Sequence, residues 1–266
     1  MEMYTHILPS GATLTGYLRD CTQSMPRFNT RPAVLICPGG GYNHCSVREG
    51  DPVAMPFLQA GYQVFVLSYT VAPAPLRWQP LLDAAGAILH LRRNAGKLRV
   101  DPCKIAVCGF SAGGHLAAST AILWDAEPVR CALGIHGKEA RPDAVLLGYP
   151  VISAGVFAHA GSFDQLAGQD PALRAAFSLE KHVQSDLPPF FLWHTVDDGT
   201  VPVQNSLLLA QALTEHQVSY ELHLFPHGQH GSSICTREVN TANPHAAAWV
   251  GLAVRWLAET FQYSLQ

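Results

Sequence analysis

The chain is poor in charged residues, and neither sign of charge dominates. Charged residues make up 14% of its 266 residues, and the formal net charge at pH 7 is −3. A protein that binds nucleic acid ordinarily presents a basic surface to the phosphate backbone. The composition offers no excess of lysine and arginine from which to build such a surface. We therefore expect no nucleic-acid partner.

The sequence also lacks a long apolar stretch. No run approaches the roughly 18 consecutive apolar residues that a membrane-spanning helix needs. The first residues, Met1 to His6, contain no basic segment that leads into an apolar one. We therefore expect neither a signal peptide nor a membrane partner.

Cysteine pairs with redox or metal-binding spacing are missing as well. The seven cysteines are odd in number, and no two of them form a Cys-x-x-Cys pair. Cys37 and Cys108 lie within apolar runs, where cysteine usually behaves as a small buried hydrophobe. Disulfide frameworks are typical of secreted proteins. The cysteine pattern therefore predicts reduced thiols and a cytoplasmic location.

What the chain has in abundance is apolar residues, at 48%. Short apolar runs alternate with segments of helical periodicity, which is typical of βαβ units. Strands are predicted at residues 33–37, 63–69, 104–108, 144–147, 190–194 and 219–225. Helices are predicted at residues 51–60, 80–96 and 112–124, from 202 onward, and from 243 to 261, with a turn at Asp101-Pro102. The pattern predicts an α/β fold in which helices cover both faces of a mostly parallel central sheet.

No linker, internal repeat or low-complexity tract divides the chain, so residues 1–266 are expected to form a single domain. Between two predicted strands, residues 150–187 show no strong periodicity. Connections this long usually carry function. We interpret this segment as a short cap or insertion on the substrate side.

A tight glycine-flanked turn surrounds Ser111. Gly109-Phe110-Ser111-Ala112-Gly113 has the pattern Gly-x-Ser-x-Gly, directly after a predicted strand and directly before a predicted helix. In this context the serine lies on a sharp, strained turn with its hydroxyl exposed at the carboxyl edge of the sheet. The helix directs its N-terminal N–H groups towards the same place. The alternative is a turn used only for packing or phosphate binding, and the strand–turn–helix context favours a nucleophilic serine.

A second glycine-rich loop, residues 38–42 (Pro-Gly-Gly-Gly-Tyr), follows the first central strand. A nucleophilic serine needs N–H donors directed at the oxyanion that develops during acyl transfer, and one of them comes from the next residue, here Ala112. Gly40 and Gly41 are the candidates for the others. The alternative is a phosphate-binding loop, but the GxxxxGKS/T pattern of that loop is missing.

Two adjacent carboxylates, Asp197 and Asp198, follow the predicted strand at residues 190–194. In this type of fold an acid comes after the nucleophile in the chain and before the histidine, whose tautomer it fixes. Asp198 lies four residues before Pro202, a spacing common in this fold, so we favour Asp198. Asp197 stays an alternative and would otherwise serve the turn.

The base is expected in a glycine-flanked loop beyond the last strand. His230, which Gly231 follows, fits this position better than His227. A metal site formed by His223, His227 and His230 is an alternative, but the spacing matches no standard zinc pattern. We therefore predict His230 as the base and expect no metal.

With these residues in place, the sequence resembles the α/β-hydrolase superfamily over nearly its whole length. Within it, the chain is similar to small acetyl esterases and xylan esterase-like (BD-FAE-like) enzymes. The segments that carry the resemblance are PGGGY at 38–42, GFSAGGH at 109–115, WHTVDDGTVPVQNS at 193–206 and FPHGQHG at 225–231. The sequence departs from the pattern at Pro38, where many lipase-like relatives have histidine, and at His227. Both departures leave the acyl and alcohol preference open.

The resemblance implies a role for each matched residue: Ser111 as nucleophile, Asp198 as acid, His230 as base, and Gly40, Gly41 and Ala112 as oxyanion donors. It further implies a serine carboxylesterase that cleaves short acyl groups, often acetyl, from small esters, including acetylated sugars. Such an enzyme works through an acyl-enzyme intermediate and needs no cofactor. An amide or formamide hydrolase, such as an arylformamidase, would use the same triad. A non-catalytic ligand-binding relative would normally lack one of the three residues.

Overall fold

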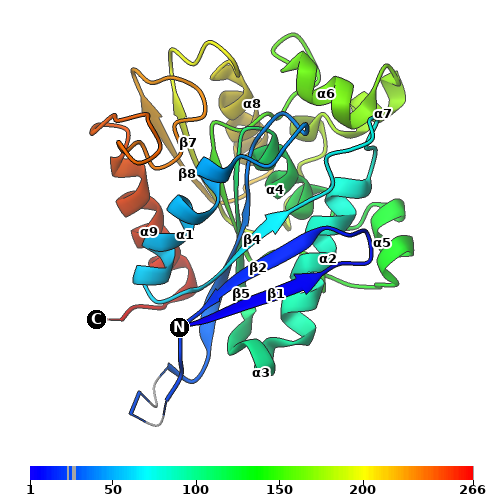
Figure 1. Cartoon of the computed structure of the whole chain (residues 1–266). Coiled ribbons are helices and arrows are strands. Elements are labelled where there is room, and N and C mark those ends of the chain that lie inside the picture. The colour runs from blue at the N-terminus through cyan, green and yellow to red at the C-terminus, as the bar shows by residue number, and fades with distance from the viewer. Residues whose placement is uncertain (23, 26–27, 266) are drawn as a thin grey trace.

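The computed structural model describes residues 1–22, 24–25 and 28–265. Within these residues, eight strands form one sheet in the order β1-β2-β4-β3-β5-β6-β7-β8 (Figure 1). The strands are β1 (Glu2–Ile7), β2 (Thr13–Leu18), β3 (Arg31–Cys37), β4 (Gln63–Ser68), β5 (Val100–Phe110), β6 (Ala144–Gly148), β7 (Phe190–Thr195) and β8 (Tyr220–Phe225).

Helices connect most of the strands. They are η2 (Val47–Glu49), α1 (Asp51–Gln59), α2 (Gln79–Arg93), α3 (Ala95–Leu98), α4 (Ala112–Ile122), α5 (Glu127–Leu133), α6 (Ala160–Ala167), α7 (Pro171–Ala176), η3 (Leu179–Lys181), α8 (Gln204–Glu215) and α9 (Ala248–Phe261). Among the described residues, no helix combines the length and the apolar composition that crossing a membrane requires.

The strands from β3 to β8 run parallel to one another, whereas β2 pairs antiparallel with both β1 and β4. This arrangement confirms the predicted mostly parallel sheet. The β1–β2 hairpin was not predicted, because β1 lies at the edge of the sheet and its side chains are largely exposed. An edge strand of this kind lacks the continuous apolar run that marks a buried parallel strand.

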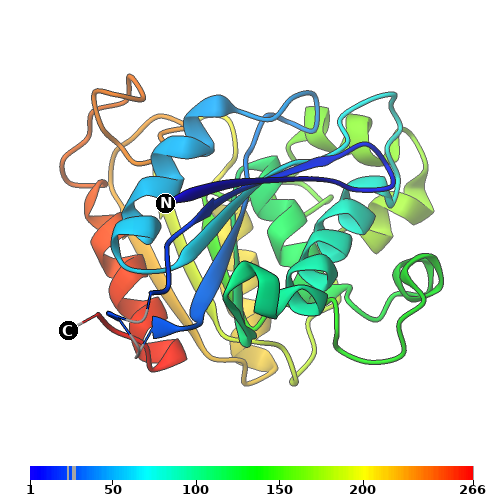
Figure 2. The same ribbon diagram turned by 60° about the horizontal axis from the view of Figure 1, so that its bottom comes forward.

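The side chains of β3 alternate between two apolar cores. Val34 and Ile36 pack in the core that contains residues of α1 and α9. Ala33 and Leu35 pack on the opposite face, in the core that contains residues of α2, α4 and α8. Figures 1 and 2 show these two helix layers on either side of the sheet. Burial on both faces explains why the central strands are continuous apolar runs.

Two local predictions were wrong. Asp101-Pro102 does not form a turn before the strand but lies within β5, where the register between β3 and β5 shifts. Such an irregularity accommodates a proline, which has no N–H for the ladder. The last helix begins at Ala248 rather than near Asn243. The Asn243 side chain instead caps a turn, because its Oδ1 accepts a hydrogen bond from the N–H of Ala246.

Residues 150–187 contain α6, α7 and η3. Figure 1 shows α6 and α7 at the end of the molecule where β5 leads into α4. The backbone N–H groups of Leu76 and Arg77 donate to the carbonyl oxygens of Gln165 and Leu166. These hydrogen bonds join residues 150–187 to the loop after β4. The segment therefore borders the carboxyl edge of the sheet.

Candidate active site

Ser111 occupies a strained turn between β5 and α4. Its backbone has φ 54° and ψ −122°, in a region that L-residues other than glycine seldom adopt. A Cβ on Gly109 would lie 2.1 Å from the carbonyl oxygen of Gly113, and a Cβ on Gly113 would lie 2.1 Å from that of Cys37. Both distances are far below van der Waals contact. Neither glycine could therefore carry a side chain without a shift of the backbone around the turn.

We expect Gly109→Ala to destabilise the fold, because the added methyl group collides with backbone that cannot move without breaking the turn. The expected loss in the free energy of unfolding is about 3 kcal/mol, at the upper end of the usual cost of overpacking. Urea unfolding followed by circular dichroism measures it. Gly251→Ala in α9 is the control, since a Cβ there has no neighbour within 4 Å. Equal stability of the two variants would contradict the expectation.

Three side chains that are distant in sequence form a continuous hydrogen-bonded chain. Ser111 Oγ lies 2.8 Å from His230 Nε2. His230 Nδ1 lies 2.7 Å from Asp198 Oδ2. Ser111 is 6% exposed, so its hydroxyl is largely enclosed. The structure thus brings together the serine, histidine and aspartate that the sequence singled out.

The surroundings of Asp198 favour its charged form. Its Oδ1 accepts hydrogen bonds from the N–H groups of Thr200 and Val201, at 2.9 and 3.0 Å. Burial alone would raise the pKa of Asp198, but the nearby ring of His194 and the hydrogen bond from His230 outweigh it and hold the pKa well below its ordinary value. The carboxylate is therefore available to orient and stabilise a protonated His230.

Asp197 points to a different partner. Its carboxylate accepts from the N–H of Gly228 at 2.8 Å and lies 3.0 Å from His227 Nδ1. These contacts, the bond to His227 first, lower the pKa of Asp197, which is exposed. Asp197 thus joins two turns at the surface and does not contact His230 in the described structure.

The three histidines of the metal alternative contact three different carboxylates. His223 lies against Glu221, His227 against Asp197, and His230 against Asp198. Within the part of the chain that the structure describes, no three His, Cys, Asp or Glu side chains are grouped so that they could hold a metal ion. The geometry therefore gives no support to a metal centre in this loop.

The glycine loop after β3 packs against the serine turn. A Cβ on Gly39 would lie 3.0 Å from Ser111 Cβ. Gly40 and Gly41 have positive φ values of 128° and 63°. The N–H of Gly39 donates to Glu49, whereas those of Gly40, Gly41 and Ala112 have no hydrogen-bond acceptor among the described residues. These three amides are therefore free to bind an external oxygen.

His115, one turn into α4, links the glycine loop to residues 150–187. The carbonyl oxygen of Phe177 lies 2.9 Å from its Nε2, and a carbonyl only accepts, so Nε2 carries the proton. Nδ1 then accepts from the hydroxyl of Tyr42, at 2.8 Å. Burial lowers the pKa of His115 to about 4. The ring is therefore a neutral structural connector near neutral pH.

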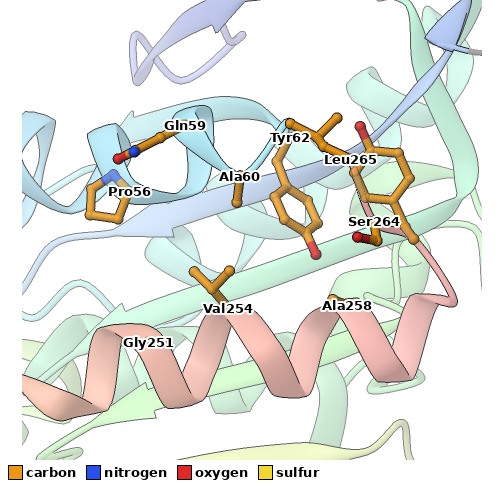
Figure 3. A pocket seen from close by; sticks show the side chains of 10 residues that line it. Pro56, Gln59, Ala60, Tyr62, Gly251, Val254, Ala258, Ser264 and Leu265 are labelled. Carbon is orange, nitrogen blue, oxygen red and sulfur yellow. The ribbon is translucent and has the colours of Figure 1, made fainter.

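A cavity of about 430 Å³ lies between α1, α9 and the C-terminal residues (Figure 3). Val254 and Ala258 of α9 face Ala60 and Tyr62 across it. None of Ser111, His230 and Asp198 is among the residues that line this cavity. This cavity is therefore separate from the hydrogen-bonded chain of Ser111, His230 and Asp198.

A strand–serine–helix elbow at the carboxyl edge of a mostly parallel, eight-stranded sheet defines the α/β-hydrolase class. The comparisons agree, since residues 87–261 match the model of the prolyl oligopeptidase family and residues 22–150 match that of BD-FAE. The chain therefore belongs to the α/β-hydrolase superfamily and, within it, to the prolyl oligopeptidase family in the broad sense of that model. The similarity to BD-FAE-like esterases inferred from the sequence is confirmed.

The relatives are named mainly as enzymes that act on esters or xylan. Endo-1,4-beta-xylanase B of Butyrivibrio fibrisolvens is 41% identical over 78% of this chain and 33% of its own length. An acetylxylan esterase of Xylanibacter ruminicola is 29% identical over 78% of this chain and 42% of its own length. The chain thus spans less than half the length of either relative.

A solved structure covers almost the whole chain. It is the acetyl ester-xyloside bifunctional hydrolase of Caldicellulosiruptor lactoaceticus, which is 38% identical, with a TM-score of 0.81 over 97% of this chain and 90% of that one. The fold of the chain thus has a counterpart of nearly the same extent.

Proposed function

We propose that the chain is a serine carboxylesterase in which Ser111, His230 and Asp198 form the catalytic triad. One observation carries the proposal: the Ser111 hydroxyl, the His230 ring and the Asp198 carboxylate form an unbroken hydrogen-bonded chain. We propose the amides of Gly40 and Gly41, in the loop that packs against the serine turn, and of Ala112, the residue after the serine, as the oxyanion donors. This combination provides a nucleophile, a base and a site for developing negative charge.

The reaction proceeds in two acyl-transfer steps. His230 Nε2 takes the proton of Ser111 while Oγ attacks the ester carbonyl, and the amides hold the resulting oxyanion. His230 then gives that proton to the alcohol as its C–O bond breaks, which leaves an acyl group on Oγ. A water molecule passes a proton to His230 and attacks the acyl carbon. The acid leaves, and Oγ regains its proton.

The substrate class we propose is a small ester with a short acyl group, in particular acetyl, and with a sugar among its possible alcohols. The names of two relatives, an acetylxylan esterase and an acetyl ester-xyloside hydrolase, support this choice. We propose no cofactor for this reaction, since the triad and the amides supply each group that it needs. The cytoplasmic location inferred from the cysteines stays a prediction.

We further propose that residues 1–266 form a single hydrolase domain, with residues 150–187 as a short cap on its substrate side. The contact of the Phe177 carbonyl with His115, on the helix that follows the nucleophile, supports this assignment. So does the position of α6 and α7 beside the end of the molecule where β5 meets α4 (Figure 1).

A panel of substrates tests the function. We expect hydrolysis of p-nitrophenyl acetate to exceed that of the butyrate and octanoate esters, and we expect release of acetate from acetylated xylose. An N-formyl aryl amide in the same panel tests the formamide hydrolase alternative, which faster cleavage of the amide would favour. Labelling by a fluorophosphonate tests the non-catalytic alternative, since a chain that has lost the chemistry would remain unlabelled.

A further inference from the structure

Glu49 is a buried carboxyl group that the proposed mechanism does not use. It ends the short η2 turn and is 3% exposed. Its Oε2 accepts a hydrogen bond from the N–H of Gly39 at 2.8 Å, and its Oε1 accepts one from the hydroxyl of Tyr149 at 2.6 Å. Burying a carboxylate costs free energy unless its oxygens are bonded in this way. A buried carboxylate with this free-energy cost is expected to have a role, and its two hydrogen-bond partners indicate which one.

The two partners lead to the two loops that flank the Ser111 hydroxyl. Gly39 immediately precedes the proposed oxyanion donors, and a Cβ there would lie 2.7 Å from Glu49 Oε2, so only glycine lets the carboxylate approach. On the other side, the Tyr149 hydroxyl accepts from the N–H of Ser233 at 2.8 Å. Ser233 follows His230 in the same loop, and the rings of Tyr149 and His230 lie 5.0 Å apart.

The backbone of η2 adds a further contact with the histidine loop. The hydroxyl of Ser233 donates to the carbonyl oxygen of Arg48, the neighbour of Glu49. The loop of His230 is thus held by the η2 turn through the backbone of Arg48 and through the Glu49–Tyr149 pair. Both attachments meet at Ser233, three positions from the proposed base.

The directions of the hydrogen bonds favour a charged Glu49. The N–H of Gly39 only donates, so Oε2 must accept. The Tyr149 oxygen already accepts from Ser233, which leaves its own proton for Oε1. If Glu49 carried a proton, that proton would point at the N–H of Gly39 or at the hydroxyl of Tyr149. The hydrogen of that group would then have no acceptor. Burial keeps the pKa of Glu49 above its ordinary value, although the bonds from Tyr149 and Gly39 and the nearby His230 oppose that shift.

We propose that Glu49 is a positioning residue that fixes the glycine loop after β3 and the loop that contains His230 in place relative to each other. It acts through the N–H of Gly39 on one side and through the hydroxyl of Tyr149 on the other. It does not touch the substrate. The proposal rests on the esterase function, because the relative position of the two loops matters only when the base and the oxyanion donors must act on one carbonyl group.

Glu49→Gln is the test, because it preserves shape but removes one acceptor, so that one of the two bonds is lost. We expect kcat for p-nitrophenyl acetate to fall by about 10- to 100-fold, somewhat less than the loss of a whole oxyanion donor. KM should change by less than about twofold, since an interaction that matters in the transition state lowers kcat rather than ground-state binding. A trifluoromethyl ketone inhibitor should lose affinity by a similar factor.

Tyr149→Phe is the second variant, because it breaks the same connection from the other side. We expect a decrease in kcat of the same kind, and the double variant should lose less than the product of the two single losses. Asp143→Asn is the matched control. This carboxylate also accepts from a backbone N–H, that of Ile105, and from a side-chain donor, that of Arg92. Asp143 precedes β6 and so lies at the amino ends of the parallel strands, away from Ser111. The Asp143→Asn substitution should therefore lower the thermal midpoint without changing kcat.

An unchanged kcat in folded Glu49→Gln would overturn the proposal. If that variant does not fold, an unchanged kcat in Tyr149→Phe would overturn it in the same way. Additive losses in the double variant would also count against a shared connection. Failure of the esterase function itself looks different, since the wild-type protein would then hydrolyse no ester or would do so equally well after Ser111→Ala.

Discussion

Replacing Ser111 by alanine is expected to lower kcat for p-nitrophenyl acetate by about 10⁶-fold, the magnitude found when the nucleophile of a comparable triad is removed. The physical reason is that no other hydroxyl lies against His230 Nε2, whose described partner is Ser111 Oγ at 2.8 Å. The oxyanion donors remain, so a small residual rate above the uncatalysed one is expected. Purified protein and a spectrophotometric assay measure the decrease.

The fold of the variant must be shown to survive. Ser111 has a positive φ, and alanine carries the same Cβ, so the substitution adds no new steric strain at the turn. Circular dichroism and the thermal midpoint should therefore match the wild type closely. A folded Ser111→Ala protein that retains wild-type turnover would rule out the proposed nucleophile.

Asp198→Asn is expected to lower kcat by about 10⁴-fold, as the loss of the acid does in other triads. The amide no longer stabilises a protonated His230, and it favours the wrong ring tautomer. In the same assay, Asp197→Asn is the matched neighbour. Its carboxylate contacts His227 and Gly228 rather than His230, so we expect its kcat to change by less than about threefold.

A reversed result, with the larger loss in Asp197→Asn, would assign the acid to the neighbouring residue. Urea unfolding separates the two causes of lost activity, because the carboxylate of Asp198 also accepts from the N–H groups of Thr200 and Val201. An asparagine oxygen can keep one or both of these bonds. A variant that unfolds at a lower urea concentration but is fully folded at the assay temperature still reports on catalysis.

The parts of the site that could be predicted are those that local sterics impose. The turn at Ser111 needs glycine at 109 and 113 because a Cβ at either position would lie 2.1 Å from a backbone carbonyl oxygen, and this need leaves the Gly-x-Ser-x-Gly pattern in the sequence. The order of nucleophile, acid and base is the one that this type of fold uses, and the carboxyl ends of its parallel strands meet at one edge. These constraints predicted Ser111, Asp198 and His230 as neighbours.

The parts that escaped prediction depend on contacts between distant segments. Glu49 and Tyr149 are 100 positions apart and belong to no motif, so nothing in the local sequence indicates that their side chains meet. The β1–β2 hairpin escaped for a different reason. Its outer strand lies on the rim of the sheet, and half-exposed edge strands carry weak apolar patterns.

The separation of the site residues along the chain has a consequence for how activity is acquired. Ser111 and His230 are 119 positions apart, and their loops follow β5 and β8, which are joined only through β6 and β7. The hydroxyl and the imidazole cannot meet until those intervening strands have docked in order. Turnover should therefore recover among the last signals during refolding, behind the return of helical circular dichroism. A polypeptide cut short before β8 would be inert, however well its first half folds.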